Sequence, residues 1–210
     1  DRPGLGYSER PKDEAATFAV QARLIRGALT QLGIEKPILV GQSRGGEIAL
    51  KYALDYPDDI ASVVLLGSSP YPNETPDSVF DTIEGIVTTP VLGDFVLHTI
   101  YVPIARQVMS PFLEEYIEYF APLDEVPPSY YDTSLELALR PTMVKADAQE
   151  EKVVSESLEK LCTRFDEISV PVVIVTGDLD TYAMEQAPRL DDDLPNSEIV
   201  IVEGAHHFLW

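Results

Sequence analysis

Cysteine is nearly absent from this sequence of 210 residues, since Cys162 is the only one. A single cysteine cannot form an intrachain disulfide, and it excludes zinc sites that are built from paired cysteines. The sequence also lacks any apolar run of roughly 18 residues, the length that a membrane-spanning helix needs. We therefore expect no membrane span, and the compartment of the protein stays open.

Basic residues are also scarce. The chain has 15 Lys and Arg against 36 Asp and Glu, which gives a formal net charge of −21 at pH 7. Nucleic-acid binding relies on a basic surface, so we expect no nucleic-acid partner. We interpret the excess of Asp and Glu as a solvated acidic surface that aids solubility and suits a saline habitat. The cluster Asp191–Asp193 leaves a cationic partner or a metal as the less favoured alternative.

Short apolar runs alternate with helix-forming stretches over much of the chain. The runs lie at residues 37–40, 63–66, 171–175 and 198–202, and helical spacing of apolar residues marks 13–32 and 45–54. Continuous apolar strands separated by helices are typical of a parallel sheet that is covered on both faces. The sequence therefore predicts an α/β protein with a mostly parallel sheet and helices on both faces.

The alternation stops between residues 71 and 165. This segment has a helical pattern, is rich in proline and aromatic residues, and is too long for a connecting loop. We interpret it as a helical cap inserted between two parts of a core, residues 1–70 and 166–210. We expect most of its aromatic residues to pack the cap against the core, and the cap to favour a small or medium apolar substrate.

The stretch from Gly41 to Gly46 holds a Gly-x-Ser-x-Gly pattern between an expected strand and an expected helix. In this setting the pattern predicts a sharp turn that exposes the hydroxyl of Ser43 as a nucleophile. We expect side chains at Gly41 and Gly45 to collide with the neighbouring strand or helix. The amide of Arg44 would face the substrate's carbonyl oxygen as one oxyanion donor.

A serine nucleophile needs a base, and the chain has only three histidines. His98 lies inside the expected cap, where a structural role or a place in the pocket is more plausible. His206 and His207 follow the last strand, and the carboxyl ends of parallel strands share one edge of the sheet. Either of these two can serve as the base, whereas two adjacent side chains diverge and are poorly placed to bind a metal together.

An acidic group should orient the base and stabilise its protonated form. Asp178 and Asp180 both follow the expected strand at residues 171–175, at the same edge of the sheet as Ser43. The residues alone leave both as candidates.

These segments resemble the α/β-hydrolase fold family, in its branch of cap-bearing esterases, haloperoxidase-like enzymes and C–C bond hydrolases. Residues 1–8 are similar to the family's Asp-x-x-Gly-x-Gly-x-Ser loop, and residues 41–46 match its nucleophile turn. Residues 177–180 resemble the acid turn, and residues 204–208 resemble the histidine turn. The resemblance implies that Asp180 is the acid and His207 the base, with Asp178 and His206 as less favoured alternates.

The resemblance implies a serine hydrolase that cleaves an ester or a similar acyl bond of a small molecule through an acyl-enzyme, without a cofactor or metal. A C–C bond hydrolase and a cofactor-free haloperoxidase or perhydrolase are alternatives, as is a non-catalytic protein that binds a ligand or partner. Ser43 argues against relatives that carry Asp there, the haloalkane dehalogenases and epoxide hydrolases. The oligomeric state is not predicted.

Two family elements have no counterpart in the sequence. One is the earlier strand whose turn supplies the second oxyanion amide, and the other is the last helix after the histidine. We therefore expect these residues to be a piece of a longer protein, with half of the oxyanion hole present. On its own, such a chain would be a poor enzyme and would fold poorly.

Overall fold

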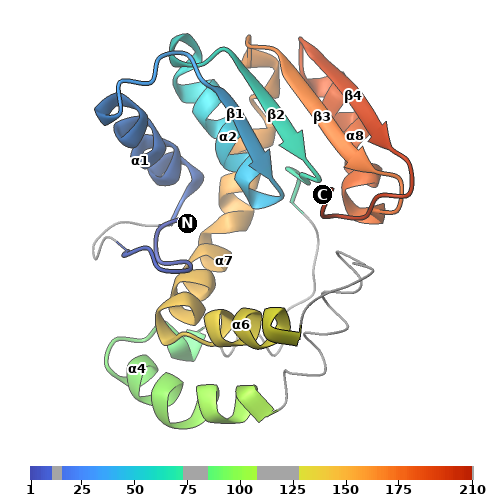
Figure 1. The fold of residues 1–210 in the computed structure, drawn as a ribbon. Helices are drawn as coiled ribbons and strands as arrows, with labels where there is room; N and C mark the ends of the chain where they lie inside the picture. Colours follow the sequence, from blue (N-terminus) through green and yellow to red (C-terminus); the bar gives the residue numbers. More distant parts are fainter. Residues whose placement is uncertain (11–15, 73–84, 108–127, 210) are drawn as a thin grey trace. The chain divides into compact units, whose positions relative to one another are not determined.

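The computed structural model describes residues 1–10, 16–72, 85–107 and 128–209, which form two compact units (Figure 1). The sheet unit consists of Thr17–Pro72 and Val154–Trp210, and the helical unit consists of Asp1–Ala16 and Asn73–Val153.

The sheet unit is built on four parallel strands. They are β1 (Ile38–Gln42), β2 (Ser62–Leu66), β3 (Val172–Gly177) and β4 (Ser197–Val202), and they lie side by side in sequence order. In register, Val40 lies opposite Val64, which in turn lies opposite Val173. The predicted parallel sheet is confirmed, and all four carboxyl ends meet at one edge.

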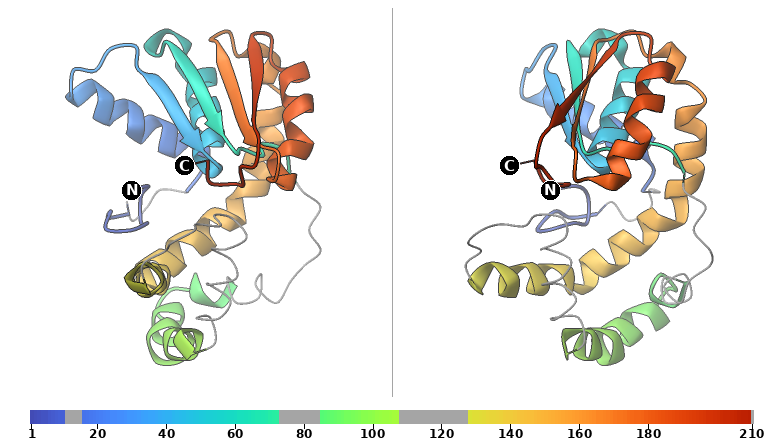
Figure 2. Two further views of the ribbon diagram at one scale, coloured as in Figure 1. Left: turned by 45° about the vertical axis from the view of Figure 1, so that its right-hand side comes forward. Right: turned by 90° about the vertical axis from the view of Figure 1, so that its right-hand side faces the viewer.

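Helices α2 (Arg44–Asp55) and α8 (Thr181–Asp193) pack on one face of this sheet, α2 against β1 and β2 and α8 against β3 and β4 (Figure 2). Helix α1 (Phe18–Gln31) packs on α2, and the end of α7 (Pro141–Cys162) joins the same core. Two short 3-10 turns, η1 (Pro57–Asp59) and η3 (Phe165–Glu167), precede β2 and β3. The strand residues that face this layer are buried: Val63, Leu65, Val172 and Ile174.

The opposite face of the sheet is apolar and open within the part of the chain that the structure describes. Ile38 is 60% exposed and Val40 is 62% exposed, although both are aliphatic residues in a strand. Val64 lies beside Val40 in the sheet and Val173 lies beside Val64, and both are only half-buried. The second helical layer expected from the continuous apolar strands is therefore not among the described residues.

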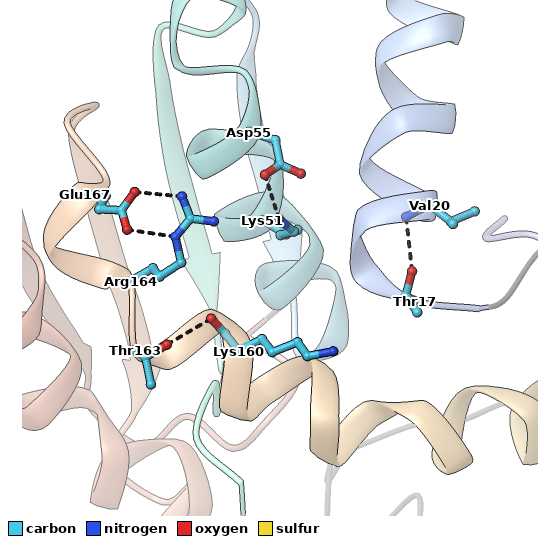
Figure 3. A network of polar contacts seen from close by, with 8 residues as sticks. All are labelled: Thr17, Val20, Lys51, Asp55, Lys160, Thr163, Arg164 and Glu167. Atoms are coloured by element: carbon cyan, nitrogen blue, oxygen red, sulfur yellow. Dashed lines mark hydrogen bonds and ion pairs between the residues drawn. The ribbon is translucent and has the colours of Figure 1, made fainter.

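Local polar contacts fix the helix ends of the sheet unit (Figure 3). The Thr17 hydroxyl caps α1 by accepting a hydrogen bond from the amide of Val20 at 3.4 Å. Arg164 binds Glu167 through two parallel hydrogen bonds of 2.7 and 2.6 Å around the turn η3. Helix α1 ends at Gln31, one residue before the end of the predicted helix, and Gly33 follows the C-cap with a φ of 67°. Residues 13–15 of the expected helix lie outside the described residues.

The described part of the helical unit holds α4 (Leu92–Val96), a turn of π-helix η2 (Leu97–Tyr101), α6 (Pro128–Ala138) and the first part of α7. Val87, Leu97 and Ala148 form a small core of their own. The loop of residues 1–10 is tied to α7, because Arg2 and Arg10 both form ion pairs with Glu150, whose side chain is buried. Residues 73–84 and 108–127 of the predicted cap lie outside the described residues.

Candidate active site

The candidate residues of the sheet unit lie on turns that follow the carboxyl ends of three strands. Ser43 and Arg44 follow β1, Asp178 and Asp180 follow β3, and the turn with His207 follows β4. A fourth turn, after β2, begins at Gly67. Side chains far apart in the sequence thus share one edge of the sheet, as parallel pairing requires.

Ser43 has a backbone conformation that side chains rarely adopt, with φ 47° and ψ −124°. It occupies the N-cap position of α2, where a serine hydroxyl normally accepts a hydrogen bond from the helix amides, yet it makes no such bond. The side chain is half-buried. The hydroxyl of Ser43 therefore does not cap the helix, which is the usual role of a serine at this position.

Three hydrogen bonds hold the backbone of Ser43. Its amide donates to the carbonyl oxygen of Leu66 at 2.9 Å, which joins the turn to β2. Its carbonyl oxygen accepts from the amide of Gly46 at 2.8 Å and from the hydroxyl of the buried Ser68 at 3.1 Å. Neighbouring elements thus keep the strained conformation in place.

The glycines of this turn differ in how much space they have. A Cβ on Gly41 would lie 2.3 Å from the carbonyl oxygen of Gly45, so the expected collision at Gly41 is confirmed. The same expectation for Gly45 is wrong, because no described atom lies within 4 Å of a Cβ built there. The tight position is Gly46, which the sequence analysis missed, where a Cβ would lie 1.9 Å from Oγ of Ser68.

Asp180 and His207 form a hydrogen-bonded pair. Nδ1 of His207 lies 2.8 Å from Oδ2 of Asp180, and both side chains are largely buried. An ionised carboxylate only accepts, so Nδ1 of His207 donates the proton in this hydrogen bond. The other carboxylate oxygen caps α8 by accepting from the amide of Ala183 at 3.2 Å.

This environment keeps Asp180 ionised. Burial alone would raise the pKa of Asp180, but the hydrogen bond with His207 and the amides of Ala183 and Tyr182 outweigh burial. The net result is a pKa below the usual value. A carboxylate at the N-terminus of a helix is also favoured by the helix dipole.

The two alternates from the sequence occupy different places. Asp178 is exposed, and its Oδ1 accepts a hydrogen bond from the amide of Gly204 at 2.7 Å. The amides of Asp178 and Leu179 donate to the carbonyl oxygens of Val202 and Ala205 at 3.2 and 3.0 Å. The structure thus joins Asp178 to the backbone of the histidine turn, and not to an imidazole. His206 is half-buried beside His207.

Gln42 and Gly67, at the ends of β1 and β2, both lie close to the histidine turn. The side-chain amide of Gln42 donates to the carbonyl oxygen of His207 at 3.5 Å. Gly67 lies against the Asp180–His207 pair, since an added Cβ would lie 3.2 Å from Nδ1 of His207 and 3.1 Å from Oδ2 of Asp180. These contacts were not foreseen, because a glutamine at the end of a strand and a glycine in a turn carry no distinct sequence signal.

Other candidate sites in the described residues are weaker. His98 is exposed on η2 of the helical unit. A cavity of about 400 Å³ lies between the end of α1 and η1, and no candidate residue lines it. No group of three or more His, Cys, Asp or Glu in the described ranges could hold a metal ion. None of the described helices has both the length and the apolar character needed to cross a membrane.

Comparisons with known proteins agree with this architecture. A family model described as alpha/beta hydrolase fold matches residues 1–210. Among solved structures, a serine hydrolase from Cycloclasticus zankles has a TM-score of 0.72 at 17% identity, with 99% of this chain and 71% of that chain covered. At this identity the likeness supports the fold alone.

Two curated relatives share a shorter stretch of sequence. A 2-hydroxy-6-oxononadienedioate/2-hydroxy-6-oxononatrienedioate hydrolase from Paraburkholderia phymatum is 40% identical over 67 residues. A 2-hydroxy-6-oxo-6-phenylhexa-2,4-dienoate hydrolase from Burkholderia cepacia is also 40% identical over 67 residues. In both cases the match covers 32% of this chain and 23% of the relative.

Proposed function

Because the chain belongs to the α/β-hydrolase fold family, we propose that it is a serine hydrolase that cleaves an ester or a similar acyl bond of a small molecule. The observation that carries the proposal is the Asp180–His207 pair, joined through Gln42 to the turn that strains Ser43. We assign Ser43 as nucleophile, His207 as base and Asp180 as the group that orients the base.

The reaction would proceed in two halves. Nε2 of His207 takes the proton of Ser43 as Oγ attacks the acyl carbon, and the resulting imidazolium gives this proton to the leaving alcohol. Collapse of the tetrahedral intermediate breaks the bond to the alcohol and leaves an acyl group on Oγ. Water then attacks the acyl-enzyme with the same base, which releases the acid and restores the serine.

The amide of Arg44 would stabilise the oxyanion. Arg44 is the first residue of α2, where an amide has no acceptor inside the helix, and the dipole of α2 adds positive potential at that end. One such donor contributes about 3–4 kcal/mol to transition-state stabilisation in comparable sites. The chemistry needs no cofactor or metal.

Labelling with a fluorophosphonate, which phosphonylates activated serines, tests the proposal. The complete protein should be modified at Ser43, and Ser43→Ala should abolish the reaction. Ser155→Ala removes an exposed hydroxyl from α7 and should label as the wild type does. A folded protein that does not label would favour a non-catalytic protein that binds a ligand or partner.

A C–C bond hydrolase is the second candidate, and the sequence match to the two dienoate hydrolases favours it. The same serine, histidine and aspartate would be used. Cofactor-free haloperoxidase or perhydrolase activity is a further alternative from the family resemblance. Turnover of p-nitrophenyl esters of increasing chain length, measured beside a 2-hydroxy-6-oxo-dienoate, separates ester from C–C hydrolysis.

A further inference from the structure

The turn after β2, residues 67–69, is held by neighbouring elements on both sides. The amide of Gly67 donates a hydrogen bond to the carbonyl oxygen of Val175 in β3 at 2.9 Å. The amide of Ser69 donates to Oε1 of Glu47, a buried carboxylate in the first turn of α2, at 3.3 Å. The residue between them, Ser68, is therefore fixed relative to both the sheet and α2.

Ser68 directs its hydroxyl at the backbone of the serine turn. Its side chain is buried, and Oγ donates a hydrogen bond to the carbonyl oxygen of Ser43 at 3.1 Å. The amide of Gly46 donates to the same oxygen at 2.8 Å. A Cβ at Gly46 would lie only 1.9 Å from Oγ of Ser68, so the glycine leaves the space that this hydroxyl occupies.

The carbonyl that Ser68 binds belongs to the same peptide group as the amide of Arg44, the proposed oxyanion donor. This peptide is trans and planar, so its C=O and N–H point in opposite directions. A donor that fixes the direction of the carbonyl therefore also fixes the direction of the amide. Hydrogen bonds accepted by a carbonyl also polarise the peptide, which makes its N–H a stronger donor.

We infer that Ser68 is a positioning residue that orients and strengthens the oxyanion donor of this site. The inference rests on the proposed function and adds a residue that the Gly-x-Ser-x-Gly pattern does not contain. Ser68 acts through the Ser43–Arg44 peptide and not on the substrate itself. The next hydroxyl along the turn offers a contrast, because Oγ of Ser69 is buried but makes no hydrogen bond within the described part of the chain.

An ester and its thionoester test this on the complete protein: p-nitrophenyl butyrate and O-p-nitrophenyl thionobutyrate. Sulfur accepts hydrogen bonds weakly, so the thiono compound gains little from an oxyanion donor. In Ser68→Ala the amide of Gly46 still holds the carbonyl, so kcat/KM for the ester should fall by about tenfold, less than the roughly 10²–10³-fold loss of a whole donor. For the thionoester we expect a fall of less than about twofold, so the ester-to-thionoester ratio should fall by about fivefold or more.

Ser69→Ala is the matched control, since it removes a hydroxyl from the same turn that makes no hydrogen bond in the described residues. Its ester-to-thionoester ratio should equal that of the wild type. Ser68→Cys is the second variant, because it keeps a side chain of similar size and replaces the hydroxyl with a weak donor. It should lower the ratio as Ser68→Ala does, and it tests the inference if Ser68→Ala does not fold.

The outcomes separate this inference from the proposed function. If the wild type does not label at Ser43 and hydrolyses neither ester, the proposed function fails. If the wild type is active, equal losses for the ester and the thionoester in Ser68→Ala would overturn the inference alone, because a displaced serine or histidine affects both substrates. An unchanged ester rate in Ser68→Ala, or a drop in the ratio as large in Ser69→Ala, would overturn it too.

Discussion

Nδ1 of His207 lies 2.8 Å from Oδ2 of Asp180, while the second oxygen of the same carboxylate caps helix α8 through the amide of Ala183. One side chain thus serves both the proposed catalytic base and the start of a helix. The cap fixes where the carboxylate lies, and the carboxylate fixes which nitrogen of the imidazole carries the proton.

Asp180→Asn should separate these two roles. Asparagine also caps helices well, so we expect the free energy of unfolding to change by less than about 1 kcal/mol. It can present an NH₂ group to Nδ1 and so favour the wrong tautomer, and kcat should fall roughly 10³–10⁴-fold. Urea unfolding and ester hydrolysis measure the two effects. Unchanged turnover in a folded Asp180→Asn protein would exclude the assignment.

Asp178 should act through the backbone of the histidine turn. Asp178→Ala removes the acceptor for the Gly204 amide, so this amide should exchange its hydrogen at least about tenfold faster and kcat should fall by about tenfold, with KM little changed. Asp178→Asn keeps an acceptor oxygen and should restore most of kcat. Asp192→Ala, at an exposed position on α8, is the control. A loss of kcat in Asp178→Asn as large as in Asp180→Asn would show that Asp178 is the acid after all.

The strained backbone of Ser43 should lower stability. Glycine adopts a φ of 47° without strain, and the relief of roughly 1–3 kcal/mol exceeds glycine's entropic cost of about 0.5–1 kcal/mol. Ser43→Gly should therefore stabilise the protein by about 1 kcal/mol in urea unfolding, whereas Ser43→Ala should not. Both variants should lose fluorophosphonate labelling. Equal stability of the two variants would show that the turn stores no strain.

The tight contact at position 46 predicts that a second substitution, at Ser68, restores stability lost by a substitution at Gly46. Gly46→Ala should lower the free energy of unfolding by about 2 kcal/mol, because its Cβ would lie 1.9 Å from Oγ of Ser68. Adding Ser68→Gly removes that oxygen and should recover much of the loss. Gly45→Ala should be neutral or stabilising by up to about 1 kcal/mol, since it replaces glycine in a helix that has room for the methyl group. A large loss in Gly45→Ala would restore the original expectation of a collision there.

Tyr71 should make the protein sensitive to alkali. Burial, and then the 2.6 Å hydrogen bond to Asp193, raise the pKa of Tyr71 well above its usual value near 10. An acid with a raised pKa stabilises the fold below its unfolded pKa and loses that contribution as the pH rises above it. Above pH 10 the free energy of unfolding should therefore fall more steeply in the wild type than in Tyr71→Phe, by about 1.4 kcal/mol per pH unit.

Urea unfolding at pH 8, 10 and 11 measures this difference. Some dependence should remain in Tyr71→Phe, because the pKa values of Tyr52 and Tyr101 are raised too. Parallel curves for the two proteins would contradict the prediction.

The sequence predicted the sheet well because its strands are short, wholly apolar runs that only a covered parallel sheet accommodates. The strands observed at Ile38–Gln42 and Val172–Gly177 extend the predicted runs by only two residues. The residues alone left Asp178 and Asp180 equivalent, since both follow the same strand, and only the family resemblance favoured Asp180. The fold shows that Asp180 meets His207 while Asp178 meets the amide of Gly204. The space at Gly46 depends on Ser68, which the local sequence pattern does not contain.

The four strands lie in the sheet in the order in which they occur along the chain, from β1 to β4. During synthesis on the ribosome, the turn with Ser43 therefore emerges before β2, β3 and β4. The turn with His207 follows the last strand and completes the pair with Asp180. On the proposed roles, a nascent chain carries an inert serine until nearly all of these residues have been translated, so its reactivity switches on only as the sheet is finished.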